Sequence, residues 1–519
     1  MYSNKENVNI LTALLVAHGV THAVVCPGSR NAPIVHNLNE CPAIACFPVT
    51  DERSAGFYAL GMAQALGKPV AVCVTSGTAL LNLAPAVAEA FYQHVPLLVI
   101  SADRPPQWID QLDGQTLPQP DALGRFVKKA VTLPEPDDDE SRWFCNRLVN
   151  EALLERHAPV HINVPISEPL FGFTVEALPD ERRIKLIEAT TPNYVLSHIC
   201  HMFMQAQRPM LIADQPLNSL LDEAVMLAGD DAGFVPDFVL YTGGSIVSKR
   251  VKRFLRKAKE TWVVNRTGEV TDTFMNLTHV VEGDGDEVAD LVRFQLEQNP
   301  HPFVNKWNEL LAKVRQQADA YRPAYSQMAA VRAFEWQLSS EMEDFWVHYA
   351  NSSAIRLANI YARHPVYCNR GVNGIEGSLS TAAGFSCVTD EKVFCVIGDL
   401  SFFYDQNALW NQNLRGNLRV LLLNNGRGGI FNQLRGLEQS PARDSLVAAC
   451  HQTSAEGICQ QNHVAYQKAT DMDSMQQGIR WLLQTNSEHP LLLEVLTDVN
   501  EDERVMKDYY HEQKPEGGH

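Results

Sequence analysis

The sequence of 519 residues lacks several features, and each absence argues against a class of protein. It has no hydrophobic run of about 18 residues, so no membrane-spanning helix is predicted. Its 43 Lys and Arg residues are outnumbered by 61 Asp and Glu residues, which leaves a net charge of −18. Such a chain lacks the positive field that a nucleic-acid or anionic-membrane binder needs, although small anionic substrates respond to local charge in a cleft. The glycine-rich loops GxGxxG and GxxxxGK(S/T) are absent, so dinucleotide or nucleotide binding is not indicated.

The eleven cysteines contain no CxxC pair, and some lie inside apolar runs, such as Cys73 and Cys395. Free, buried thiols have this distribution, which favours a reducing, cytoplasmic location. The N-terminal run ILTALLVAHG is short and lacks a basic leading segment. It predicts an amphipathic helix and not a signal peptide.

Short apolar, β-branched runs alternate with longer helical patterns, such as those over 54–67 and 78–93. Strands buried on both faces have this character, so the alternation predicts parallel α/β sheets. A polar linker over 177–194 and a charged helix over 300–327 separate three groups of runs. We therefore expect three consecutive α/β domains, at residues 1–176, 190–325 and 326–519. The predicted strands are 22–27, 44–49, 69–75, 96–101 and 159–165, then 209–214, 237–244, 261–266 and 278–283, then 345–351, 392–399, 419–425 and 490–496.

The third group contains a pair of strand ends suited to a hard cation. One strand ends in Gly398-Asp399 and a second ends in Asn424-Asn425. Carboxylate and amide oxygens at neighbouring strand ends suit Mg²⁺ bridging to a diphosphate. Gly-Asp alone would predict only a turn, but the pair resembles the thiamine-diphosphate-binding motif of the thiamine-dependent enzymes. The resemblance implies that Asp399, Asn425 and the backbone of Arg427 ligate Mg²⁺, with Mn²⁺ as an alternative.

A second candidate, Glu52, follows a predicted buried strand and opens an apolar helix. A carboxylate there could simply stabilise the helix N-terminus. In thiamine-dependent enzymes, a glutamate at this place is the catalytic acid that contacts N1′ of the aminopyrimidine, which requires a dry carboxyl of raised proton affinity. We expect the side chain of neighbouring Asp51 to point elsewhere. Because the superfamily binds the two ends of the cofactor on different domains, usually across a subunit interface, the resemblance implies at least a homodimer, with a tetramer as the alternative.

Several ordered motifs narrow the resemblance and extend over essentially the whole chain. They include VVCPGSRNAPI (24–34), ISADRPPQWID (100–110) and YCNRGVNGIEGSLSTAAG (367–384). Together they resemble the 2-succinyl-5-enolpyruvyl-6-hydroxy-3-cyclohexene-1-carboxylate synthase family of menaquinone biosynthesis. That family decarboxylates 2-oxoglutarate with thiamine diphosphate and adds the resulting carbanion to isochorismate. Two alternatives stay open: another thiamine-dependent 2-oxo-acid decarboxylase or lyase, and a non-catalytic cofactor-binding paralogue.

The resemblance also implies the residues that contact substrates and cofactor. Both substrates are dicarboxylates, and arginine suits fork-like carboxylate binding. Ile375 is expected to prop the cofactor in its V shape, although plain core packing is the alternative for such a residue. The expected substrate contacts are Ser29, Arg30, Arg104, Gln115, Lys249, Arg250, Ser352, Arg356 and Arg370, and the further cofactor contacts are Thr78, Leu400, Ser401 and Ile430.

Two positions depart from the family pattern. Gly114 stands where an asparagine is expected beside Gln115, and Arg427 stands where the family often has glycine. Arg253, Arg256 and Arg419 match no motif and are interpreted as surface charge. The histidines are scattered singly, so we expect mostly surface or helix-cap roles and assign none to proton transfer.

Overall fold

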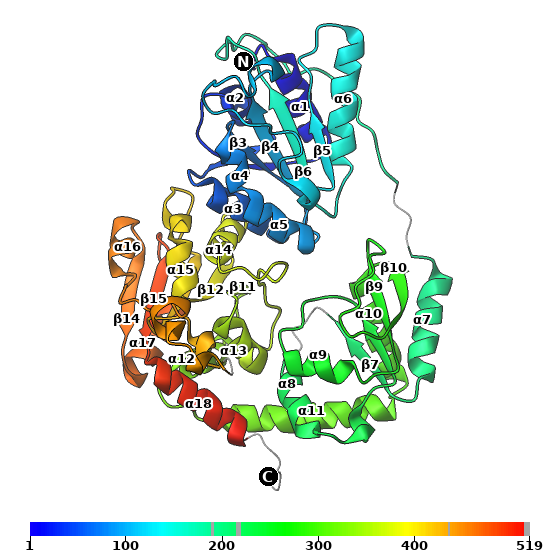
Figure 1. Ribbon diagram of the computed structural model, residues 1–519, viewed down its shortest axis with the longest axis vertical. Coiled ribbons are helices and arrows are strands. Elements are labelled where there is room, and N and C mark those ends of the chain that lie inside the picture. Colours follow the sequence, from blue (N-terminus) through cyan, green and yellow to red (C-terminus); the bar gives the residue numbers. More distant parts are fainter. Residues whose placement is uncertain (188–190, 214–218, 434–435, 513–519) are drawn as a thin grey trace.

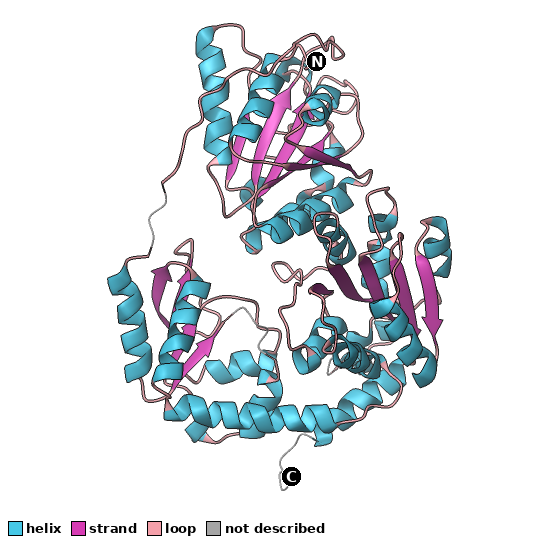
Figure 2. Ribbon diagram, turned by 180° about the vertical axis from the view of Figure 1, so that it is seen from behind, coloured by secondary structure: helices cyan, strands magenta, loops and turns pink. Residues whose placement is uncertain are grey.

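The computed structural model describes residues 1–519 except 188–190, 214–218, 434–435 and 513–519. It has three separate sheets, and every strand pairing within them is parallel. Helices cover the sheets, as Figure 2 shows. The predicted α/β class with parallel sheets is therefore confirmed.

The N-terminal unit has a six-stranded sheet in the order β2-β1-β3-β4-β6-β5. Its central strands are nearly continuous runs of buried apolar residues, as expected for a sheet covered on both faces. Its elements are α1 (Glu6–Ala17), β1 (His22–Val25), α2 (Ala32–Glu40), β2 (Ala45–Pro48), α3 (Glu52–Leu66), β3 (Val70–Val74), α4 (Thr78–Asn82), α5 (Ala84–Tyr92), β4 (Leu97–Asp103), β5 (Lys129–Thr132), α6 (Asp139–Leu153) and β6 (Val160–Pro165).

The central unit has a four-stranded sheet in the order β10-β9-β8-β7. The long helix α11 runs beneath this unit toward the C-terminal unit (Figure 1). The elements are α7 (Asn193–Gln205), β7 (Pro209–Ile212), α8 (Leu221–Ala228), β8 (Phe238–Tyr241), α9 (Lys249–Leu255), β9 (Glu260–Asn265), β10 (Leu277–Glu282), α10 (Gly285–Gln298) and α11 (Pro302–Ala320).

The C-terminal unit has a five-stranded sheet in the order β11-β12-β13-β15-β14. Its elements are α12 (Gln327–Leu338), β11 (Phe345–Tyr349), α13 (Ser353–Tyr361), α14 (Ser378–Ser386), β12 (Lys392–Gly398), α15 (Asp399–Tyr404), β13 (Leu418–Asn424), α16 (Glu456–Gln461), β14 (Ala465–Ala469), α17 (Met472–Gln484), β15 (Leu491–Leu496) and α18 (Val499–Glu512).

The N-terminal and C-terminal units share one hydrophobic core, in which α3 packs directly on α14. Glycines allow the two backbones to approach closely. A Cβ built on Gly61 would lie 1.9 Å from the carbonyl oxygen of Thr381, and one on Gly384 would lie 2.2 Å from that of Tyr58. The Tyr58 hydroxyl also donates a hydrogen bond to the Ala408 carbonyl at 2.6 Å. The contact fixes the orientation of α3, whose first residue is Glu52.

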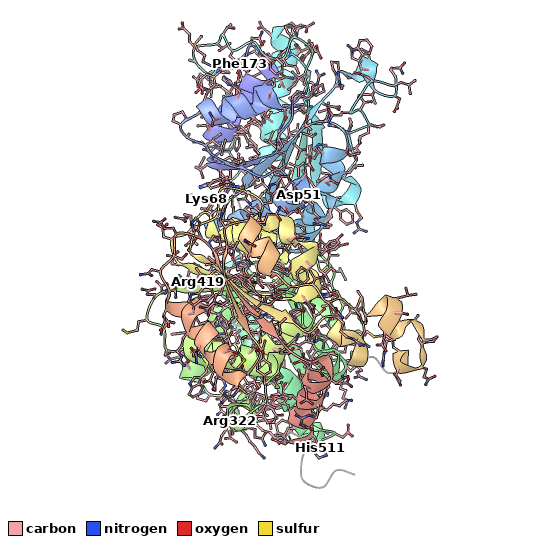
Figure 3. The ribbon with its side chains drawn as sticks, turned by 90° about the vertical axis from the view of Figure 1, so that its left-hand side faces the viewer. Asp51, Lys68, Phe173, Arg322, Arg419 and His511 are labelled. Carbon is pink, nitrogen blue, oxygen red and sulfur yellow. The ribbon has the colours of Figure 1, made fainter. Side chains whose placement is uncertain are left out.

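Several expectations about local structure need correction. The helix expected over 78–93 is two helices, α4 and α5, because Pro85 in the first turn of α5 has no N–H to continue the ladder. The apolar pattern does not predict strands β5 and β14, because both are partly exposed edge strands without a continuous apolar run. Arg419 is not surface charge: its side chain is 3% exposed and donates to the carbonyls of Leu482 and Thr485 at the end of α17 (Figure 3).

The eleven cysteines are all free thiols, and most of them are buried. Among the described residues, no helix combines the length and apolarity needed to cross a bilayer.

Candidate active site

The ends of β12 and β13 meet around the carboxylate of Asp399, which is 4% exposed. Its Oδ1 accepts a hydrogen bond from the Leu400 amide at 2.7 Å, and its Oδ2 accepts from the amides of Asn425 (3.2 Å) and Gly426 (2.8 Å). Burial raises the pKa of Asp399, while these amides and His451 favour the charged form. The two strand ends predicted to lie together therefore do so, and we call residues 398–400 with 424–427 the Asp399 turn.

The two asparagines of this turn have different partners. Asn424 is buried and donates to Glu494 Oε1 at 2.8 Å and to the Thr453 carbonyl, so it binds neighbouring segments of the same unit. Asn425 donates its Nδ2 to Asp502 Oδ2 of α18 at 2.9 Å, so its amide oxygen is the atom that could ligate a cation. The Arg427 side chain pairs with Asp444.

The groups at the Asp399 turn fit a hard cation. The carboxylate of Asp399, the amide oxygen of Asn425 and the backbone carbonyl of Arg427 are oxygen donors of the kind that Mg²⁺ prefers. Leu400 and Ser401 form the first turn of α15 beside them, and Ile430 lies half-buried in a short 3₁₀ turn over Gly429–Gln433.

Sequence reasoning missed His451. Its Nε2 lies 3.4 Å from Asp399 Oδ2, and its backbone amide donates to the Gly426 carbonyl at 2.8 Å. The ring packs edge-on against Phe403. His451 lies in a loop without periodicity, so no pattern could have identified it.

Two further histidines, His161 and His348, are 1% and 3% exposed, which corrects the expectation of surface roles for these two.

The turn before α3 separates two neighbouring carboxylates. Asp51 is the N-cap: it accepts from the Ser54 amide and from Asn407 Nδ2 at 2.7 Å, and Figure 3 places it where the N-terminal unit meets the C-terminal unit. Glu52 is half-buried, and within the part of the chain that the structure describes its Oε2 accepts one hydrogen bond, from Asn82 at 3.1 Å. The side chains of Asp51 and Glu52 thus have separate partners, as expected.

The turn from β3 into α4 brings Thr78 beside the loop of Gln115. Gly77 has φ 82° and its Cβ position would lie 3.2 Å from the backbone of Gln115, so only glycine fits there. Thr78 and Gln115 are both exposed. The fully buried Gln119 holds the turn in place by accepting from the Gly77 amide at 2.7 Å.

Two of the predicted arginines in the N-terminal unit come together. Arg30 is 5% exposed and donates to the Ile166 carbonyl at 2.9 Å and to Glu168 at 3.1 Å. Arg104 lies 3.9 Å from the same Glu168 and pairs with Asp113 at 3.0 Å. Ser29 is exposed beside them, and a Cβ built on Gly114 would meet nothing within 4 Å.

A second group of cations combines arginines of the C-terminal unit with Lys252 of the central unit. Arg370 donates to Asn351 Oδ1 at 3.0 Å; burial lowers its pKa, as does the nearby charge of Arg356. Lys252 of α9, which sequence reasoning missed, has its pKa lowered by burial and by the charge of Arg370. Ser352 precedes α13 with φ 68°, a strained conformation for a residue with a side chain. Strain of this kind often marks functional sites.

Ile375 is 40% exposed, which excludes plain core packing as its role.

Arg250 pairs with Asp222 at 3.1 Å and lies over the ring of Tyr510, while Lys249 is exposed at the start of α9. Within the described part of the chain, no ion pair or hydrogen bond joins the two groups of predicted substrate cations.

Comparison with known proteins adds independent evidence. Residues 6–123 match the family described as thiamine pyrophosphate enzyme, N-terminal TPP binding domain. Over almost the whole chain, the sequence is similar to proteins named 2-succinyl-5-enolpyruvyl-6-hydroxy-3-cyclohexene-1-carboxylate synthase. It is 43% identical to that of Bacteroides thetaiotaomicron over 99% of this chain and 100% of the relative. It is 44% identical to that of Bacteroides fragilis over 99% and 100%, and 41% to that of Phocaeicola vulgatus over 98% and 99%.

Identity of this extent, together with the thiamine pyrophosphate domain and the strand-end carboxylates, fixes the family. The chain belongs to the 2-succinyl-5-enolpyruvyl-6-hydroxy-3-cyclohexene-1-carboxylate synthase family of thiamine-diphosphate-dependent enzymes.

Proposed function

We propose that this chain converts 2-oxoglutarate and isochorismate into 2-succinyl-5-enolpyruvyl-6-hydroxy-3-cyclohexene-1-carboxylate and CO₂. The bond between the carboxyl and the 2-oxo carbon of 2-oxoglutarate breaks, a carbon–carbon bond forms to the isochorismate ring, and the ring takes up one proton. No redox step is needed. The observation that carries the proposal is the full-length similarity to synthases of this name, with Glu52, Asp399 and Asn425 all present.

The residues of the site divide the work. Thiamine diphosphate, when bound, supplies the electron sink for loss of CO₂. Asp399, Asn425 and the Arg427 carbonyl would hold Mg²⁺, or Mn²⁺, which would neutralise the charge of the diphosphate. Glu52 would hold the proton that it shares with N1′ of the aminopyrimidine, and Ile375 would support the bound cofactor. Thr78, Leu400, Ser401 and Ile430 would line the cofactor.

The basic groups select the substrates. Two dicarboxylates need several cations, and a monocarboxylate with an apolar tail needs fewer. We assign carboxylate and ring contacts to Ser29, Arg30, Arg104, Gln115, Lys249, Arg250, Ser352, Arg356 and Arg370. The engagement of Arg30 and Arg104 by Glu168 supports a preformed anion site, because one carboxylate already lies between two arginines.

We further propose that two copies of the chain complete each active site. Glu52 needs a dry environment, yet in one chain it is half-buried. Apolar side chains near the predicted site are also exposed, including Leu81 (43%), Leu112 (103%) and Val372 (47%). A second copy would cover such a surface and bring Glu52 of one chain to the Asp399 turn of the other.

The free thiols support a cytoplasmic location, because thiols stay reduced there.

The reaction is tested by incubating the purified chain with thiamine diphosphate, Mg²⁺, 2-oxoglutarate and isochorismate, and identifying the product by mass. We expect the named product and one CO₂ for each 2-oxoglutarate consumed. Replacing 2-oxoglutarate with pyruvate is the matched control and should give no comparable product. Preferred use of pyruvate, release of a free aldehyde, or no turnover by cofactor-loaded protein would contradict the proposal.

A further inference from the structure

Glu89 of α5 is a buried carboxylate that the proposed mechanism does not use. Its side chain is 3% exposed. A carboxylate out of water is stable only when hydrogen bonds replace the lost hydration, so its partners identify what it stabilises. Its two oxygens accept hydrogen bonds from consecutive backbone amides: Gly371 at 2.6 Å to Oε1 and Val372 at 2.7 Å to Oε2.

These two amides belong to the loop of residues 370–377, which we call the Arg370 loop. The loop lies in the C-terminal unit, whereas Glu89 lies in the N-terminal unit, 282 positions away from Gly371. At one end, the loop carries Arg370, the proposed substrate contact. Near the other end, it carries Ile375, the proposed support of the cofactor. Charge adds to the link, because Glu89 favours the charged form of the Arg370 guanidinium.

Helix α5 approaches the backbone of this loop closely at Gly371. A Cβ on Gly371 would lie 2.8 Å from the main-chain oxygen of Glu89 and 3.0 Å from both its Oε1 and the Cβ of Tyr92. Only glycine therefore fits at this position without a shift of the loop. A third hydrogen bond to Glu89, from Gln93 Nε2 at 2.6 Å, comes from the helix side and orients the carboxylate.

The rest of the loop has its own attachment. Asn351 donates Nδ2 to the carbonyls of Asn369 (2.7 Å) and Gly374 (2.8 Å) and accepts from Arg370 Nη1. Asn351 thus binds the loop from within the C-terminal unit, whereas Glu89 binds its backbone amides from the N-terminal unit, where Phe57 also packs against Gly377. Removing Glu89 would leave two backbone amides without acceptors, and the loop would have to move to hydrate them.

We propose that Glu89 is a positioning residue that holds the Arg370 loop against the N-terminal unit and so sets the places of Arg370 and Ile375. This inference rests on the proposed function for the roles of those two residues. Glu89 touches neither substrate nor cofactor in this assignment. It acts through the loop backbone, and its removal affects use of substrate more than retention of cofactor.

The test compares Glu89→Gln with the wild-type chain by hydrogen-exchange mass spectrometry and by kinetics. The carboxamide keeps one acceptor but places an NH₂ group against a backbone amide. We expect exchange in the Arg370 loop to rise about tenfold while α14 stays protected. KM for 2-oxoglutarate or isochorismate should rise about tenfold or more, with thiamine diphosphate affinity within about threefold of wild type.

Two further variants keep the test decisive. Gln93→Leu removes the hydrogen bond to Glu89 on the helix side and the one that Gln93 accepts from Gln64 of α3. It leaves both loop bonds intact, so it should match wild type in loop exchange and KM. Gly371→Ala adds a methyl group to the loop where it meets Glu89 and leaves the sequence of α5 unchanged. It should reproduce the effect of Glu89→Gln. If Glu89→Gln fails to fold, Gly371→Ala decides the question.

Unchanged exchange in the Arg370 loop would overturn the proposal, and so would faster exchange with unchanged KM. Acceleration that extends throughout α14 would overturn it as well, because the effect would then be general destabilisation. The exchange measurement needs no substrate. If the wild-type chain makes no product, the proposed function fails, while the exchange result still decides whether Glu89 holds the loop.

Discussion

The Asp399 turn and the turn before α3, which carries Glu52 and which we call the Glu52 turn, occupy corresponding places, each where a strand leads into a helix. Asp399 is buried, accepts three backbone hydrogen bonds and has His451 beside it. Glu52 is half-buried, and among the described residues it accepts one hydrogen bond, from an asparagine side chain. Backbone hydrogen bonds within the Asp399 turn therefore hold its carboxylate in place. The Glu52 carboxylate has no such bonds among the described residues and remains partly open to water.

This difference agrees with the tasks proposed for the two turns. A carboxylate that ligates a metal must be charged and rigidly held, and hydrogen bonds from backbone amides favour both. A carboxyl that shares a proton with a weakly basic ring nitrogen must instead be dry and free of strong donors that would favour its charged form. The comparison predicts that changes at Glu52 affect turnover, while changes at Asp399 affect cofactor retention.

The largest expected effect is the loss of turnover in Glu52→Gln. The carboxamide keeps the size of the side chain but cannot share a proton with the cofactor, so kcat should fall by about 10²–10⁴. Thiamine diphosphate affinity, measured by titration, should stay within a few-fold of wild type. Asp51→Asn is the matched control: asparagine also caps helices well, so this variant should keep turnover. Normal turnover in Glu52→Gln would remove the catalytic role and with it the contrast between the turns.

The next effect is on cofactor retention in Asp399→Asn. This variant loses the metal-binding charge and places an NH₂ group against backbone amides that now donate to the carboxylate. Mg²⁺-dependent affinity for thiamine diphosphate should fall by about 10- to 100-fold. The control is Asp390→Asn, a carboxylate on the surface whose ion pair with Arg415 is exposed. Unchanged affinity in Asp399→Asn would place the metal elsewhere.

The same comparison explains what the sequence can predict. Both turns follow predicted strands, so the pattern alone locates Asp399 and Asn425 at strand ends and Glu52 shortly after a strand. The strand before Glu52, β2, is a partly exposed edge strand and not the buried strand that the sequence predicts. The order of the motifs then indicates the family. Central strands of a parallel sheet and the residues that follow them are local features, which one segment of sequence specifies.

Other parts of the site depend on segments that meet only in the folded chain. Edge strands such as β14 are half-exposed and lack an apolar run. His451 lies in an irregular loop, and Glu89 lies on an ordinary amphipathic helix whose partner is 282 positions away. The sequence around Arg419 predicts a surface charge, but in the folded chain α17 packs over this side chain. Arg419 then donates hydrogen bonds to carbonyls at the end of α17. No local pattern encodes these contacts.

The relative placement of the two turns depends on the α3–α14 contact, so a change there should weaken the fold before it changes chemistry. In Gly384→Ala, the new methyl group would lie 2.2 Å from the Tyr58 carbonyl oxygen, and α14 must shift. We expect a loss of about 1–3 kcal/mol in the free energy of unfolding, measured with denaturant. Gly457→Ala in α16, where the new Cβ would meet nothing within 4 Å, should be neutral or slightly stabilising. Equal free energies of unfolding for the two variants would show that the contact between α3 and α14 accommodates a methyl group at Gly384.

The smallest expected effect concerns the central unit, which approaches α18 through Glu223 of α8. Burial, reinforced by Asp222, raises the pKa of Glu223 to about 7, from 4.5 for a free side chain. The native state therefore holds this proton more tightly than the unfolded chain does, so ionisation destabilises the fold progressively as pH rises from about 4.5 to about 7. Glu223→Gln cannot ionise and should flatten this part of the profile, raising Tm at pH 7 relative to its value at pH 5 by about 1–3 °C compared with wild type. Thermal unfolding at the two pH values measures this difference. A profile that keeps the wild-type slope would show that Glu223 does not carry the pH dependence.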